Sequence, residues 1–167
     1  MAVNFLEQLI AEWYEYQGYY IRRNVKVGPR LRGGYEGELD VVAFHPNLKR
    51  LVHLEASSDT SSWEERETKF RRKFETGRKY ASTLFPGLDV GDAIEQFAVF
   101  AYASTKNVKH VGGGRVVLLS DLLTEILSLL KSRSFMNQAV PEHQSLLRTL
   151  QVVSFFRRAT LAALAEG

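Results

Sequence analysis

The sequence predicts an α/β domain with a mixed sheet flanked by helices, and three observations support this fold class. Apolar residues recur at helical spacing near the N-terminus, from Phe5 to Tyr14. Three segments rich in β-branched and aromatic residues follow within 19–56, with no helical pattern between them. A long basic helical segment then precedes another apolar strand, so strands and helices do not alternate as in a fully parallel sheet.

The first elements are predicted from local signals. A helix begins after Asn4, which caps it with Glu7 as the capping-box partner, and Gly18 ends it. Strands are predicted over 19–27, 38–44 and 50–56, and the short turn between the last two indicates an antiparallel hairpin. The glycine-rich segment 28–37 is predicted to be a loop.

The remaining elements follow from apolar patterns and from turn residues. A helix is predicted over 63–84, then strands over 97–103 and 115–119, then a helix from 120 or 121 to about 131. Pro141 opens a further helical stretch that reaches the C-terminus, with a break near Gln151. We assign residues 1–135 to an α/β core and 136–167 to a helical extension packed on that core.

Composition excludes several classes of protein. The chain has 167 residues and no cysteine, which excludes a disulfide scaffold, a thiolate zinc site and a cysteine nucleophile. No apolar run approaches the roughly 20 residues that span a bilayer, and the N-terminus lacks a basic signal-peptide region. We therefore expect a cytoplasmic protein with no membrane association. The glycines form neither a GxGxxG pattern nor a Walker A loop.

Two acids lie in strands that are otherwise apolar. Asp40 is flanked by Leu39 and Val41, and Glu55 ends the next apolar strand. A buried carboxylate is unfavourable by several kcal/mol unless it is compensated, and two on adjacent strands repel each other. A hard divalent cation, Mg²⁺ or Mn²⁺, resolves both problems because it binds one or two carboxylates plus waters. An acid paired with an arginine, or placed at a strand end, is the alternative interpretation.

The order of these motifs resembles the PD-(D/E)xK nuclease superfamily. A helix, a strand, a GELD hairpin, an LEAS strand end and a long helix are similar to Holliday-junction resolvases and Mrr-type restriction domains over about residues 4–120. The resemblance implies a restriction endonuclease-like αβββαβ core with C-terminal helices added. It also implies that Asp40, Glu55 and the Ala56 carbonyl hold the metal, while Glu7 orients a bound water or holds a second ion. Glu38, on the face of Asp40, is an alternative ligand.

One position departs from this family. The motif lysine, two residues after the glutamate, falls on Ser57, whose hydroxyl carries no positive charge. Three explanations remain open. Lys69 or Lys73, one turn apart on the following helix, projects into the same space; or the domain keeps its metal and DNA surface but cleaves poorly or not at all; or the resemblance is only structural.

The function predicted is therefore a metal-dependent DNA endonuclease of restriction, repair or recombination type. Four basic residues of the first strand and the glycine loop are predicted to contact DNA phosphates: Arg23, Lys26, Arg30 and Arg32. The alternatives are an inactive nuclease-fold subunit that binds DNA or a protein partner, and a small-molecule enzyme with a carboxylate metal site. The apolar C-terminal segment packs on the sheet or forms a homodimer. His53 shares the face of Glu55, and we interpret it as a core or surface histidine.

Overall fold

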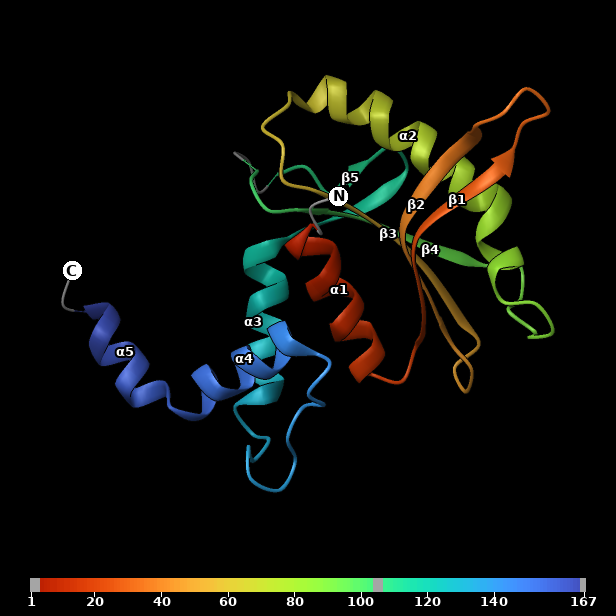
Figure 1. Ribbon diagram of the computed structural model, residues 1–167. Helices are drawn as coiled ribbons and strands as arrows, with labels where there is room; N and C mark the ends of the chain where they lie inside the picture. The colour runs from red at the N-terminus through yellow and green to blue at the C-terminus, as the bar shows by residue number, and fades with distance from the viewer. Residues whose placement is uncertain (1–3, 104–106, 166–167) are drawn as a thin grey trace. The chain divides into compact units, whose positions relative to one another are not determined.

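The structure is a computed structural model that describes residues 4–103 and 107–165 (Figure 1). The chain divides into two compact units, one ending at Leu119 and the other beginning at Ser120. The elements of the first unit are α1 (Phe5–Tyr16), β1 (Tyr20–Pro29), β2 (Tyr35–His45), β3 (Arg50–Ser57), α2 (Trp63–Tyr80), the 3-10 helix η1 (Ala81–Leu84), β4 (Ile94–Phe100), β5 (His110–Val111) and β6 (Gly114–Leu118). The helices that follow are α3 (Leu119–Leu130), α4 (Ser145–Phe155) and α5 (Arg157–Ala165).

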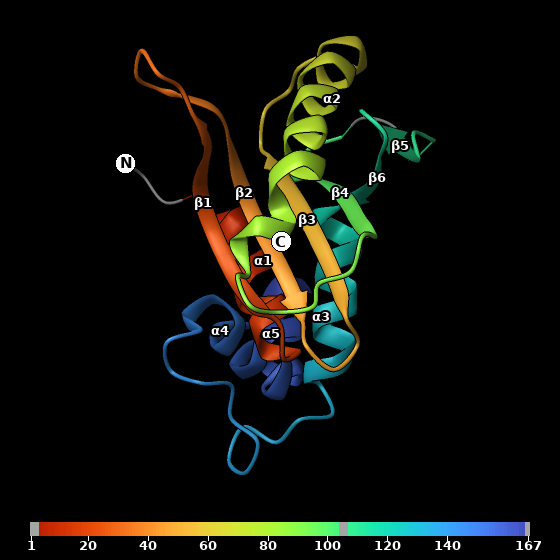
Figure 2. The same ribbon diagram turned by 90° about the vertical axis from the view of Figure 1, so that its right-hand side faces the viewer.

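The six strands form one mixed sheet in the order β1-β2-β3-β4-β6-β5. The pairs β1–β2, β2–β3 and β5–β6 are antiparallel, whereas β3–β4 and β4–β6 are parallel. Helix α2 covers one face of this sheet and α1 covers the other (Figure 2). The predicted α/β class and the antiparallel β2–β3 hairpin are thus confirmed.

The loop predicted over 28–37 is too long, because half of it is strand. The β1–β2 ladder continues from Val27↔Gly37 to Pro29↔Tyr35, which leaves only residues 30–34 in the turn. Gly28 and Gly37 lie within the strands, where a side chain would have little room, and Gly28 also has a φ of +66°. A Cβ at Gly37 would lie 3.1 Å from Thr76 Cγ2, and one at Gly28 would lie 2.7 Å from Tyr80 Oη.

Several other boundaries differ from the predictions. The helix predicted to residue 84 is α-helical only to Tyr80 and ends in the 3-10 turn η1. Strand β4 begins at Ile94 rather than 97 because it follows the parallel ladder with β3, which starts at Leu51↔Ile94. The two-residue strand β5 is too short to produce a sequence pattern and was not predicted.

The second unit also differs from the prediction in detail. Helix α4 begins at Ser145 rather than at Pro141, and the break before α5 lies at Phe156 rather than near Gln151. Gln151 lies inside α4 and is fully buried. It accepts a hydrogen bond from Val140 N (2.8 Å) and donates one to Gln138 O (2.8 Å), so it anchors the preceding loop to the helix. The packing of this unit on the core and the homodimer both stay predictions.

Two apolar clusters lie between α2 and the sheet. One contains Val42, Phe44 and Phe85, and the other contains Phe70, Phe74 and Phe100. His53 is the link between them, since it pairs across the strands with Val42 and packs edge-on against Phe74 at 5.6 Å. The core on this face is therefore interrupted by polar groups. Within residues 4–103 and 107–165, no helix has both the length and the apolar character that a bilayer crossing requires.

Candidate functional site

Three charged side chains meet where β2, β3 and α2 approach one another. Lys73 Nζ lies 3.0 Å from Asp40 Oδ1 and 3.1 Å from Asp40 Oδ2. The same ammonium donates to Glu55 Oε2. Asp40 is 7% exposed and Glu55 is fully buried, so one ammonium compensates two carboxyl groups in a place that water hardly reaches.

The β2–β3 register brings the two acids together. Val41 pairs with Leu54, which places Asp40 and Glu55 at the next step of the antiparallel ladder. The backbone amide of Ala56 donates to Asp40 Oδ2 at 3.0 Å, and the amide of Asp40 lies 3.4 Å from Glu55 Oε1. Each acid is therefore held by the backbone of the neighbouring strand.

Helix α2 delivers the lysine because its start and its buried face are both fixed. Ser62 and Glu65 form a reciprocal capping box that sets the first turn. Phe70 and Phe74 are buried against the sheet, and Lys73 lies beside them with 28% of its side chain exposed. The aliphatic part of Lys73 is thus packed while its ammonium reaches the acids.

Gln96 of β4 determines which ring nitrogen of His53 carries hydrogen. The side-chain oxygen of Gln96 accepts from Arg78 Nη1 at 2.7 Å, and an arginine can only donate. Gln96 Nε2 therefore faces the other way, where it donates to Phe74 O at 2.8 Å and lies 3.1 Å from His53 Nδ1. Nδ1 is the acceptor of that contact, so the neutral ring carries its hydrogen on Nε2.

The Nε2–H of His53 points at Glu55. Nε2 and Glu55 Oε1 are 2.7 Å apart, and both side chains are fully buried. A hydrogen-bond chain therefore runs from Phe74 O through Gln96 and His53 to Glu55. It fixes the orientation of the carboxylate in the same way that outer-shell partners orient ligating groups at metal sites.

Gly77 of α2 provides the space for this chain. A Cβ at this position would lie 2.1 Å from His53 Nδ1 and 3.0 Å from Gln96 Nε2. The first distance is far too short for a real contact, and the second is tight. The glycine in the middle of an α-helix, which is unfavourable in itself, is therefore explained by the close approach of the helix to the histidine.

The two carboxyl groups share Lys73 but have opposite pKa shifts. Burial, together with the charge of Glu55, raises the pKa of Asp40 from 3.8 to about 7, although Lys73 acts in the opposite direction. Burial also acts to raise the pKa of Glu55, but the hydrogen bond from His53 and the charge of Lys73 outweigh it and lower that pKa to about 2. Glu55 is thus the permanent anion, and Asp40 gains or loses its proton near neutral pH.

We predict from this shift that Asp40→Asn stabilises the fold at alkaline pH. An acid with a raised pKa in the folded state contributes stability at low pH that is lost as the pH rises from about 4 to 7. The asparagine amide keeps an acceptor for Ala56 N and has no charge to lose. We expect a gain of about 2 kcal/mol at pH 8 that vanishes towards pH 4, measured by urea unfolding. Asp89→Asn, at an exposed acid, is the control, and a less stable Asp40→Asn protein at pH 8 contradicts the prediction.

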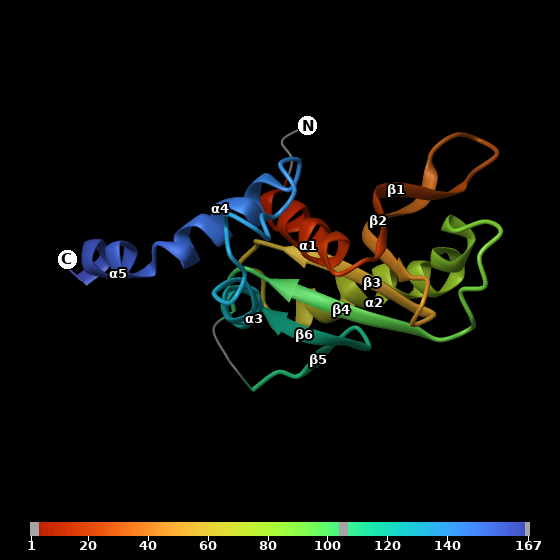
Figure 3. The same cartoon turned by 90° about the horizontal axis from the view of Figure 1, so that it is seen from below.

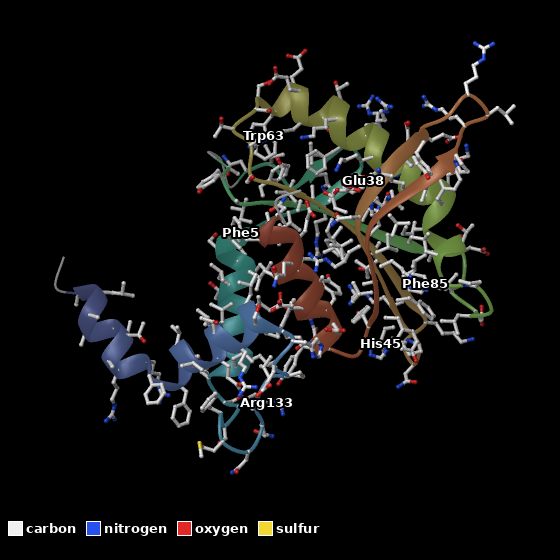
Figure 4. All side chains as sticks on the ribbon, viewed as in Figure 1. Phe5, Glu38, His45, Trp63, Phe85 and Arg133 are labelled. Atoms are coloured by element: carbon white, nitrogen blue, oxygen red, sulfur yellow. The ribbon has the colours of Figure 1, made fainter. Side chains whose placement is uncertain are left out.

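A groove with a volume of about 870 Å³ opens beside these charges, between β2 and α2. Figure 4 shows Glu38 on β2 next to this helix. The charged residues that line the groove are the acids Glu36, Glu38, Asp40, Glu64 and Glu65 and the bases Lys69, Arg72 and Lys73. Acids exceed bases, so the groove favours a cation, and a polyanion enters it readily only when cations are supplied.

The structure separates the two lysines that the sequence left as alternatives. Lys73 joins Asp40 and Glu55, whereas Lys69 Nζ lies 3.0 Å from Asp59 Oδ2 in the loop before α2. Ser57 is buried and its Oγ accepts the amide hydrogen of Asp59 at 3.3 Å. Burial acts to raise the pKa of Asp59, but the bonds with Ser57 and Lys69 outweigh it and lower that pKa.

Glu7 and the predicted DNA contacts lie in other parts of the first unit. Asn4 caps α1 by accepting from Leu6 N, but Glu7 Oε1 accepts from the side-chain Nδ2 of Asn4 at 2.9 Å, so the predicted capping box is not formed. Arg23, Lys26, Arg30 and Arg32 are all exposed on β1 or in the turn that follows it. Among the side chains of residues 4–103 and 107–165, no three or more His, Asp or Glu are grouped so that they could hold a metal ion. The metal roles of Glu7 and of the Ala56 carbonyl stay predictions.

Sequence reasoning missed Gln96 and Gly77, and it assigned no special role to His53. The signal for His53 was present in its two-residue spacing from Glu55, which places both side chains on one face of β3. Gln96 carries no such signal, because it reaches His53 only through the parallel ladder, in which the two residues are partners. Comparison with known proteins finds no matching family model and no matching curated protein.

Proposed function

We propose that this chain is a metal-dependent DNA endonuclease of the PD-(D/E)xK type, in which Lys73 replaces the motif lysine missing at Ser57. The observation that carries the proposal is the contact of one helix-borne ammonium with both Asp40 and Glu55. The order of α1, three antiparallel strands, α2 and the parallel strand β4 supports the proposal, because the resemblance implies an αβββαβ core. The position that the family fills from the strand is filled here from the next helix.

The residues present fit a divalent cation. Two carboxyl groups on neighbouring strands already surround a single positive group, the ammonium of Lys73. Mg²⁺ prefers one or two carboxylates and completes its octahedron with water, and the adjoining groove leaves room for that water. A cation bound by Asp40 and Glu55 supplies an activated water and charge stabilisation at a phosphodiester. Mn²⁺ satisfies the same oxygen ligands.

Each side chain of the site then has a distinct task. Glu55, held ionised by the hydrogen bond from His53, would be the fixed anionic ligand of a bound cation, and Asp40, whose pKa is about 7, would be the second ligand. Lys73, once released from the carboxylates, places its charge at the mouth of the groove, where it neutralises the developing charge on a phosphate. Glu38, which lines the groove with Asp40, is the further candidate for orienting water.

DNA is held by phosphate contacts with Arg23, Lys26, Arg30 and Arg32, which form no sequence-reading motif. The acidic lining of the groove repels DNA. A phosphate therefore approaches Asp40 only when cations balance the negative charge of the lining. Binding is therefore salt-sensitive and is strengthened by divalent cations.

The proposal is tested by incubating the protein with plasmid and branched DNA in Mg²⁺, Mn²⁺ or EDTA. We expect cleavage only with metal, and a loss of at least about 100-fold in Lys73→Met, because one charge-stabilising group is typically worth that factor. Lys69→Met is the matched control, one turn away on the same helix and paired with Asp59, and it should cleave within about threefold of wild type. Equal loss in both variants, or metal-independent cleavage, contradicts the proposal.

One observation favours the second candidate function, a nuclease-fold subunit that binds DNA without cutting it. Glu55 is fully buried, and both of its oxygens already have partners, in His53 and Lys73. If these contacts persist in the presence of metal, the cluster of Glu55, His53 and Lys73 has a structural role in the core. Salt-sensitive DNA binding without cleavage in either metal selects this candidate over the first.

A further inference from the structure

The turn between β1 and β2, residues 30–34, has a defined, hydrogen-bonded backbone conformation. The ladder runs up to Pro29↔Tyr35, and the turn is closed by Arg30 N to Gly34 O and by Gly33 N to Arg30 O, both at 3.0 Å. Gly33 and Gly34 take φ of +86° and +82°, which other residues rarely adopt. The hairpin therefore presents the residues of this turn in a defined conformation.

This turn holds a leucine in full contact with water between two arginines. Leu31 is 109% exposed, and Arg30 and Arg32 on either side are exposed as well. Figures 1 and 3 show the hairpin reaching beyond the other strands of the sheet. Single exposed leucines are common on protein surfaces, but one that is flanked by two cations at the tip of a projecting hairpin has the chemistry of a DNA wedge.

The same hairpin connects this turn to the candidate active site. Its β2 strand supplies Glu36, Gly37, Glu38 and Asp40 to the groove. From Tyr35 to Asp40 the strand rises about 17 Å, at about 3.4 Å per residue. One strand of duplex DNA rises 3.4 Å per base pair, so the turn lies roughly five to seven base pairs from the phosphate at Asp40.

We propose, on the basis of the proposed function, that Leu31 inserts between stacked bases while Arg30 and Arg32 contact the flanking phosphates. The free energy gained by burying one leucine is about equal to the free energy lost by unstacking one base step. Insertion into an intact duplex is therefore close to neutral in free energy. It becomes favourable where stacking is already weakened, at a mismatch, a bulge or a branch point. The preferred substrate is therefore distorted DNA whose flaw lies roughly five to seven base pairs from the cut.

The test is a fluorescence-polarisation titration of the full chain, with Ca²⁺ in place of Mg²⁺ so that the duplex stays uncut, on a paired 30-base-pair duplex and on the same duplex carrying one central mismatch. We expect wild type to prefer the mismatched duplex about tenfold, because a disrupted step no longer has to be unstacked. Leu31→Ala should lose this preference with less than about twofold change on paired DNA. Leu48→Ala, at another leucine exposed in a strand turn, is the matched control and should behave as wild type.

A fluorescent base analogue placed in the duplex locates the contact. Its emission should rise on binding of wild type and not of Leu31→Ala, at a position roughly five to seven base pairs from the cut. A preference that survives in Leu31→Ala, or is lost equally in Leu48→Ala, overturns the inference. Preferential binding without cleavage supports the wedge and refutes only the nuclease proposal. Cleavage that is unaffected by Leu31→Ala supports the nuclease proposal and refutes the wedge. Binding to anionic vesicles but to neither duplex overturns both.

Discussion

Lys73→Met is expected to destabilise the fold by about 3 kcal/mol at pH 8, because it leaves two buried carboxyl groups without a cation. Asp40 and Glu55 then repel each other in a region that water hardly reaches. The loss is measured from the midpoint of urea unfolding, with EDTA present to remove divalent metal. Lys69→Met removes an exposed ion pair with Asp59 and should change the stability by less than about 1 kcal/mol.

The pH dependence of this loss identifies its cause. The pKa of Lys73 is raised from 10.5: burial acts to lower it, and the carboxylates of Glu55 and Asp40 outweigh that effect. Lys73 therefore stays charged between pH 5 and 8, and any change in the loss over this range comes from the protonation of Asp40. In the variant, the two carboxyl groups bind protons more readily, so the loss should shrink towards pH 5. Millimolar Mn²⁺ at pH 8 should restore part of the stability. A loss that is equal at both pH values and unaffected by metal contradicts the account.

Gly77→Ala is expected to destabilise the fold by about 3 kcal/mol, although the same change usually stabilises a helix by up to about 1 kcal/mol. The added methyl group would lie 2.1 Å from His53 Nδ1 and 2.4 Å from His53 Cε1. The ring is unable to retreat, since it is fully buried and packs against Phe74. Either α2 shifts or the histidine leaves Glu55, and both outcomes weaken the site.

Two further variants make this prediction specific. Glu75→Ala, at an exposed position of the same helix, should change the stability by less than about 0.5 kcal/mol. His53→Ala removes the ring that the methyl group would strike, so the cost of Gly77→Ala in that background should fall by at least about 1 kcal/mol. Additive effects of the two substitutions would show that the methyl group strikes something other than His53. Urea unfolding of wild type, Gly77→Ala, His53→Ala and the double variant measures the coupling energy between the two substitutions.

The acids of the site were predictable from sequence because each is a charge in an apolar strand. Asp40 and Glu55 stand out by local contrast alone, and strand periodicity places them on one side of a hairpin. The choice between Lys69 and Lys73 was not predictable, because the two are one turn apart and helix periodicity gives them nearly the same face. The packing of Phe70 and Phe74 and the pull of Asp59 on Lys69 decide it in the folded chain.

The supporting chain of hydrogen bonds depends on contacts between distant segments. Gln96 meets His53 because β4 pairs with β3 in one register, and a shift of one residue would turn its side chain to the other face. The need for glycine at position 77 arises only when α2 packs on His53 and Gln96. The glycine-rich segment 28–37 misled for a related reason, since two of its glycines serve the packing of α2 against the hairpin. Sequence patterns report local preferences, whereas these features are set by neighbours in space.

The central claim is that Asp40 and Glu55 form a divalent-cation site that Lys73 occupies in the absence of metal. Calorimetric titration of Mn²⁺ at pH 8 into wild type, Asp40→Asn and Lys73→Met tests it most directly. The account predicts one site in wild type, its loss in Asp40→Asn, and tighter binding in Lys73→Met, because the competing ammonium is gone. Binding that is absent from wild type, or that is unchanged in Asp40→Asn, would contradict it.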